Sequence, residues 1–117
     1  MPLRNIYEAV GKENRVRDGE GTCNEALVFA GAELGTRIKG IGLTTIHPGS
    51  SIGVHQHGNE QEVYLIVEGQ GVATIDGREQ RVRPGDVMVN HPGGSHGLRN
   101  DTDQELRIFA FCVEGDA

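Results

Sequence analysis

Residues 53–69 read GVHQHGNEQEVYLIVEG and place two histidines, His55 and His57, at the entrance of an apolar segment. In an extended strand, residues two apart share one face, so the two imidazoles are expected to point the same way. By the same rule Glu62 and Tyr64 share a face of the next segment. A carboxylate on such a face is costly to bury unless it is paired, hydrogen-bonded or bound to a cation. This stretch therefore predicts a strand that carries metal-ligand chemistry on its inner face.

A second stretch, HPGGSHGLRN at residues 91–100, supplies a fourth candidate ligand, because His96 follows a glycine turn and opens another short strand. His55, His57, Glu62 and His96 together offer three nitrogens and one oxygen. Neutral imidazole and carboxylate suit Mn, Fe, Co, Ni, Cu or Zn, and the lack of thiolate argues against a structural cysteine-type zinc site. A six-coordinate ion held by these groups keeps two positions for water or a bidentate ligand. HQH alone is equally compatible with a solvated turn, and Glu62 and His96 favour the metal.

These residues resemble the two sequence motifs of the cupin family. The first motif, G-x5-HxH-x3,4-E-x6-G, is met by Gly49, His55, His57, Glu62 and Gly69. The second motif, G-x5-PxG-x2-H-x3-N, is met by Gly85, Gly93, His96 and Asn100, except that His91 occupies the proline slot and Pro92 is displaced by one residue. Residues 70–84 separate the motifs, a spacing similar to that of small bacterial cupins.

The resemblance implies an all-β fold, a small antiparallel β-barrel or jelly roll, with one metal held inside by His55, His57, Glu62 and His96. Similarity to small manganese or iron cupins favours Mn or Fe, with Ni, Zn, Co or Cu as alternatives. Family members are commonly dimers in which an N-terminal strand or arm packs against the partner. A homodimer is therefore expected, with residues 1–35 in that role.

Glycine patterning supports the same fold class independently. The chain has 117 residues and 18 glycines, which fall between short apolar runs, as is typical of short strands joined by tight turns. We expect a single domain over residues 1–117, with an N-terminal arm and first strand at 1–35 and the barrel core at 36–114. Residues 5–10 are the one candidate for a short helix. The expected strands cover 26–30, 36–47, 61–67, 71–75, 80–82, 86–90, 96–98 and 105–113, with a type I′ turn at Asp76-Gly77.

Charge and composition exclude several classes of partner. The net charge is −6, without a basic stripe, and aromatic residues make up 4%, which argues against nucleic acid and anionic membrane surfaces. The sequence shows neither an apolar run long enough for a membrane span nor a signal-peptide core, so a cytoplasmic location is expected. Cys23 and Cys112 are far apart and lack CxxC spacing, so two free thiols are expected.

Three residues besides the ligands are candidates for catalysis. Tyr64 would hydrogen-bond near the metal, although a core tyrosine with a satisfied hydroxyl is the commoner case. His91 would transfer protons at the mouth of the site, and Glu60 would act as an acid or base at its rim, although a solvated loop carboxylate is the commoner case.

Two main functions remain open from the sequence. One is a metal-dependent enzyme acting on a small carboxylate, enediol or similar ligand, such as a dioxygenase or an oxalate-decarboxylase-like protein. The other is a binding module that captures a small acid or sugar without turnover. An isomerase-type cupin and a metal that only stiffens the fold are further alternatives, because fold alone does not fix function.

Overall fold

The computed structural model describes residues 2–116, which form ten strands and one short 3-10 helix, η1 (Gly31–Glu33). The predicted all-β, antiparallel class is confirmed. The strands are β1 (Gly11–Asn14), β2 (Cys23–Ala30), β3 (Ile38–Ile46), β4 (Ser51–Gln56), β5 (Glu60–Glu68), β6 (Gly71–Ile75), β7 (Arg78–Val82), β8 (Val87–Asn90), β9 (Ser95–Arg99) and β10 (Leu106–Glu114).

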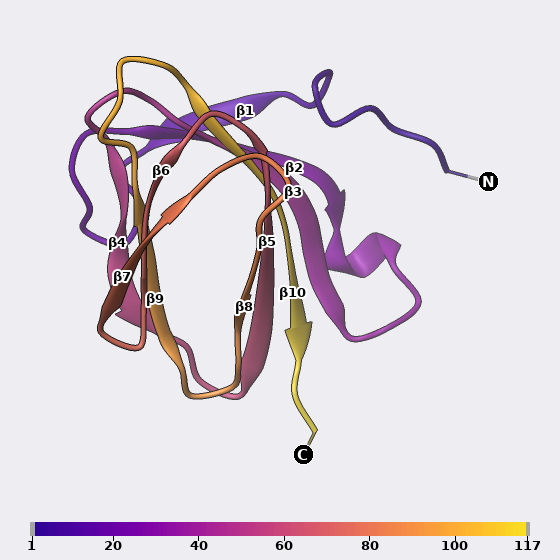
Figure 1. Cartoon of the computed structure of the whole chain (residues 1–117). Helices are drawn as coiled ribbons and strands as arrows, with labels where there is room; N and C mark the ends of the chain where they lie inside the picture. The colour runs from indigo at the N-terminus through magenta and orange to yellow at the C-terminus, as the bar shows by residue number, and fades with distance from the viewer. Residues whose placement is uncertain (1, 117) are drawn as a thin grey trace.

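Two antiparallel sheets face each other, as Figure 1 shows. One sheet has the order β1-β2-β3-β10-β5-β8, and the other has the order β4-β9-β6-β7. Within residues 2–116 the strand ladders do not join the two sheets into a closed barrel. The segment between β1 and β2 meets β4 at an isolated bridge from Val16 to Ile52. The predicted antiparallel jelly roll is therefore confirmed, and its two sheets do not close into a continuous barrel. Two packed sheets of this kind still bury one shared core without a continuous ring of hydrogen bonds.

The core lies between the sheets and takes side chains from both inner faces. Tyr64 and Ile66 of β5 are buried, whereas Val63 and Leu65 on the opposite face of the strand are only half-buried, which agrees with the predicted alternation. The buried cluster consists of Cys23, Ile46, Ile52, Tyr64, Ile66, Ala73, Val82, Met88, Leu98, Leu106 and Ile108.

The N-terminal region contributes strands to the six-stranded sheet. Residues 11–14 and 23–30 form β1 and β2, and β2 pairs with β3 in register from Cys23 opposite Ile46. Residues 5–10 form a turn and not a helix. The Asn5 carbonyl accepts from the Glu8 N–H at 3.1 Å and its side chain from the Tyr7 N–H at 2.8 Å, a local pattern that competes with helix formation.

Turn chemistry was predicted well in the second half of the chain. Asp76 and Gly77 have φ values of 46° and 80°, which are both positive as a type I′ turn requires, and they join β6 to β7. Cys23 and Cys112 are free thiols, as expected. In the part of the chain that the structure describes, none of the helical segments is long and apolar enough to cross a membrane.

Candidate metal centre

The four predicted ligands meet between the two sheets. His55 lies on β4 and His96 lies directly opposite it on β9, because the two residues are register partners. His57 follows the end of β4, where its backbone N–H donates to the Gly94 carbonyl at 3.0 Å. Glu62 reaches the same point from β5 of the other sheet. The cluster therefore takes three imidazoles from one sheet and one carboxylate from the other.

The donor atoms of the cluster are close together. The three Nε2 atoms of His55, His57 and His96 are separated by 3.0, 3.1 and 3.2 Å. Glu62 Oε1 lies 3.1 Å from Nε2 of both His57 and His96. The separation between His55 and Glu62 is wider, and all four donor atoms lie within 4.8 Å of one another.

Hydrogen bonds on the far side of two rings fix which nitrogen faces the centre. His55 Nδ1 lies 2.7 Å from the Gly53 carbonyl oxygen, and His57 Nδ1 lies 2.6 Å from a Glu60 carboxylate oxygen. Both partners are acceptors, so each Nδ1 must donate its proton and each Nε2 keeps a lone pair. Lone pairs that converge at 3.0 Å repel one another unless a proton or a cation lies between them. The donor set therefore fits a metal ion.

The separations of the donor atoms can be compared with those of ideal coordination geometries. An octahedral ion with bonds of about 2.1 Å places neighbouring donors about 3.0 Å apart and opposite donors about 4.2 Å apart, whereas a tetrahedral ion places every pair about 3.4 Å apart. Five pairs lie at 3.0–3.2 Å and one pair, His55 with Glu62, is wider. This matches four corners of an octahedron in which the two remaining corners are adjacent.

The local electrostatics prepare the ligands for a cation. Burial lowers the pKa of His55, which favours the neutral imidazole that metals require. For Glu62, burial raises the pKa, but hydrogen bonds from His96 and Tyr64 outweigh it and hold the pKa below its ordinary value. Uncharged histidine and ionised glutamate are the states in which these side chains bind metal.

The sequence of the chain matches the cupin domain family over residues 42–113, which is more than half of its length. The chain belongs to the cupin family. It is 28% identical over 113 residues to an oxalate-binding protein of Thermotoga maritima, covering 97% of this chain and 93% of that protein. A solved Thermotoga maritima structure, described as a predicted oxalate decarboxylase, has a TM-score of 0.92 and 27% identity and covers 97% of this chain and 99% of that one.

Another similar protein is named as an enzyme, and the match to it is shorter. The chain is 32% identical over 81 residues to the 5-nitrosalicylic acid 1,2-dioxygenase of Bradyrhizobium sp. That match covers 62% of this cupin but only 39% of the dioxygenase, so it concerns one part of a longer protein.

Tyr64 is buried beside the cluster, as the core reading of the sequence favoured. It is 5% exposed and its ring stacks on His96, with centroids 4.9 Å apart and planes 25° apart. Burial raises its pKa well above the ordinary value, and the neighbouring Glu62 carboxylate, to which its hydroxyl is hydrogen-bonded, raises it further. Tyr64 is thus a core residue of this cupin that contacts His96 and Glu62, and a role for its hydroxyl near a metal stays a prediction.

Glu60 is not the solvated loop carboxylate that the sequence favoured. Besides His57, it accepts from Lys39 Nζ at 2.5 Å, and these two hydrogen bonds, that of Lys39 being the larger cause, lower its pKa to about 2. Lys39 was not predicted as a site residue, and its only signal in the sequence is that it is the lone charge of strand β3. His91 is exposed, contacts Gln61 at 3.1 Å and lies outside the cluster.

A hollow of about 570 Å³ opens beside Glu62 on the inner face of the six-stranded sheet. A hollow of about 620 Å³ lies under residues 3–9, away from the cluster. The residues that border the first hollow include Lys12, Leu27, Lys39, Gly40, Gly42, Thr44, Glu62 and Ala110.

Proposed function

We propose that this cupin binds one divalent transition metal through His55, His57, Glu62 and His96, and that the bound ion holds a small dicarboxylate of the oxalate class. The observation that carries the proposal is the set of donor separations, five short and one wide, which leaves two adjacent corners of an octahedron. Two adjacent positions suit the two oxygens of a bidentate ligand. Octahedral nitrogen and oxygen coordination favours Mn or Fe over tetrahedral Zn, with Co, Ni and Cu as further candidates.

The charge of the site supports an anionic ligand. Three neutral imidazoles and one carboxylate would leave a divalent ion with a net positive charge. The chain also resembles an oxalate-binding protein over 97% of its length. The ion would supply Lewis acidity at the two open positions, and the four side chains would fix its place between the sheets.

We propose capture without turnover in preference to catalysis. Tyr64 is buried with a raised pKa, and both oxygens of Glu60 are already occupied by His57 and Lys39. His91 lies outside the cluster. The three candidate acids and bases are thus poorly placed to transfer protons to a ligand. The second candidate function is metal-dependent decarboxylation or oxygenation, which is favoured by the similarity to a structure described as a predicted oxalate decarboxylase.

Metal content and oxalate binding test the proposal together. The protein purified from its source should contain about one transition metal per chain, and calorimetry should show oxalate binding to the metal-loaded protein but not to the chelator-treated protein. His57→Ala should lower metal affinity by more than the roughly 10–100-fold typical of residues that only support a ligand. His91→Ala is the matched control and should bind metal like the wild type.

Two outcomes would decide against the proposal. Full metal occupancy in His57→Ala would overturn the assignment of the site. Metal-dependent release of CO₂ from oxalate, or metal-dependent O₂ consumption with it, would replace capture by the second candidate function.

We also propose that the partner of this chain is a second copy of itself. The outer face of the six-stranded sheet carries apolar side chains that are only partly covered, and Val87 and Val89 of β8 are 61% and 38% exposed. They stand opposite Leu65 and Val63 of β5, which are half-buried. Apolar residues gathered on one sheet face favour association with a matching face.

A further inference from the structure

A β-bulge in β3 determines where Lys39 points. Along the ladder between β3 and β10, Gly40 stands opposite Cys112 and Ile38 stands opposite Val113, so Lys39 is an extra residue without a partner of its own. A bulge of this kind re-aims side chains that strict alternation would place on the other face. Lys39 accordingly joins Gly40 and Gly42 at the hollow beside Glu62, on the inner face of the sheet.

From the bulge, Lys39 reaches a carboxylate two strands away. β10 lies between β3 and β5, and Lys39 Nζ spans it to meet Glu60 Oε2 at 2.5 Å. The other oxygen, Glu60 Oε1, lies 2.6 Å from His57 Nδ1. The exposed fraction of the side chain falls along this chain of contacts, from 51% at Lys39 to 18% at Glu60 and 4% at His57. The contacts thus lead from the surface to a buried member of the cluster.

Each contact restricts the next one. A carboxylate that accepts from Nδ1 holds the imidazole in one tautomer and one orientation, and makes Nε2 a stronger donor to a metal. A carboxylate with only one partner is free to rotate away from it. The ammonium of Lys39 occupies the second oxygen of Glu60 and so restricts this rotation. An isolated surface ion pair contributes little to the free energy of unfolding. The expected effect of Lys39 and Glu60 is therefore on the orientation of the His57 imidazole.

We infer that Lys39 and Glu60 are positioning residues of the metal centre: Lys39 fixes Glu60, and Glu60 fixes His57 with its Nε2 directed at the ion. This inference rests on the proposed metal binding. It also explains the bulge, which brings the ammonium group of Lys39 from β3 to the face of the sheet that carries Glu62.

Metal titration of the full chain tests the inference. We expect Glu60→Gln to bind Mn²⁺ or Co²⁺ roughly 10–100-fold more weakly than the wild type, and Lys39→Met to show a smaller loss in the same direction. Lys39→Arg, which keeps the charge, should restore the affinity. Arg81→Met is the matched control, because it breaks an exposed ion pair with Asp101 far from the cluster, and it should bind metal normally.

The visible spectrum of the Co²⁺-loaded protein provides a readout that a purely structural role would not change. Glu60→Gln and Lys39→Met should shift the absorption bands, because the ligand field depends on the orientation of His57, whereas Lys39→Arg should not. Melting of the metal-free variants checks that they are folded. If Glu60→Gln does not fold, the metal affinities and spectra of Lys39→Met and Lys39→Arg still test the inference. Equal values for these two variants and the wild type would overturn it.

The outcomes separate the inference from the proposed function. If the wild type binds metal and all three variants bind it with the same affinity and spectrum, the inference is overturned and the proposed function stands. If the wild type itself binds neither Mn²⁺ nor Co²⁺, the proposed function fails and the inference fails with it.

Discussion

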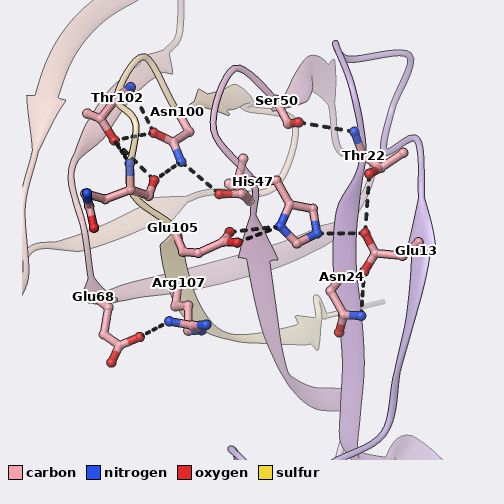
Figure 2. Close-up of polar contacts among 12 residues, drawn as sticks. Glu13, Thr22, Asn24, His47, Ser50, Glu68, Asn100, Thr102, Glu105 and Arg107 are labelled. Carbon is pink, nitrogen blue, oxygen red and sulfur yellow. Dashed lines mark hydrogen bonds and ion pairs between the residues drawn. The ribbon is translucent and has the colours of Figure 1, made fainter.

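At the scale of single residues, Asn100 shows how one side chain organises a turn. It is 2% exposed, and its Nδ2 donates to the carbonyls of Ile46 at 2.9 Å and Gln104 at 2.7 Å. Its Oδ1 accepts from the backbone N–H and the hydroxyl of Thr102, at 3.0 and 2.7 Å, as Figure 2 shows. The whole hydrogen-bonding capacity of the amide is thus used, and this holds the loop between β9 and β10.

Replacing Asn100 should therefore be costly. Asn100→Ala leaves buried backbone groups without partners, and we expect the free energy of unfolding to fall by about 3 kcal/mol. Urea denaturation followed by circular dichroism measures the change. Asp103→Ala, at an exposed position of the same loop, is the control and should stay within about 0.5 kcal/mol of the wild type. Equal unfolding midpoints for the two variants would contradict the role given to the amide.

At the scale of elements, His47 joins three segments that are distant in sequence. It follows β3, its Nε2 lies 2.7 Å from Glu13 of β1, and its Nδ1 lies 2.8 Å from Glu105, which precedes β10. Figure 2 shows the imidazole between the two carboxylates. The hydrogen bond with Glu105 is the main reason why the pKa of His47 is raised, and that with Glu13 adds to it against the opposing effect of burial. The protonated imidazole therefore links both strands.

This arrangement predicts a pH-dependent contribution to stability. The pKa of His47 is higher in the folded state than its ordinary value of 6.5, so its contribution is fully present below that value and is lost as the pH rises through the raised pKa. His47→Gln should thus be less stable than the wild type at about pH 5.5, with a smaller difference at about pH 9. Thermal melts at both pH values measure the difference in melting temperature from the wild type, with His91→Gln as the control. A difference for His47→Gln that is the same at both pH values would contradict the role given to the protonated imidazole.

The elements also show what the sequence determines and what it leaves open. Strand β5 and the meeting of Glu62 with the three histidines follow from period-two alternation and motif spacing, which are local properties. Strand β4 was not predicted as a separate strand, because its serine and glycine have weak strand preference and its pairing with β9 is long-range. The position of Lys39 depends on a bulge in the ladder with β10, seventy residues further along the chain, and local pattern contains no signal for it.

At the scale of the whole molecule, the outer face of the six-stranded sheet is the surface that we expect between two copies. The double variant Val87→Glu, Val89→Glu places two charges on the face that the second copy would cover in the proposed dimer. Because like charges from the two copies would then meet, we expect this variant to be a monomer. Sedimentation velocity measures the change. Glu79→Gln on β7, at an exposed position of the other sheet, should leave the mass unchanged. A wild-type chain that sediments as a monomer would overturn the proposal of a homodimer.

The open edges of the two sheets have a consequence for aggregation. Because the sheets do not close into a ring, β1, β7 and β8 each have one side that the strand ladders of residues 2–116 leave unpaired, whereas residues 16–20 hydrogen-bond along the outer side of β4. The free edge of β7 carries four consecutive exposed polar or charged residues, 78–81, and β1 carries Lys12, Glu13 and Asn14. Charged edges of this kind resist the addition of further strands and so oppose growth into fibrils. For the homodimer proposed above, we expect the charged edges of β1 and β7 to favour contact through the sheet face, which would keep the assembly finite.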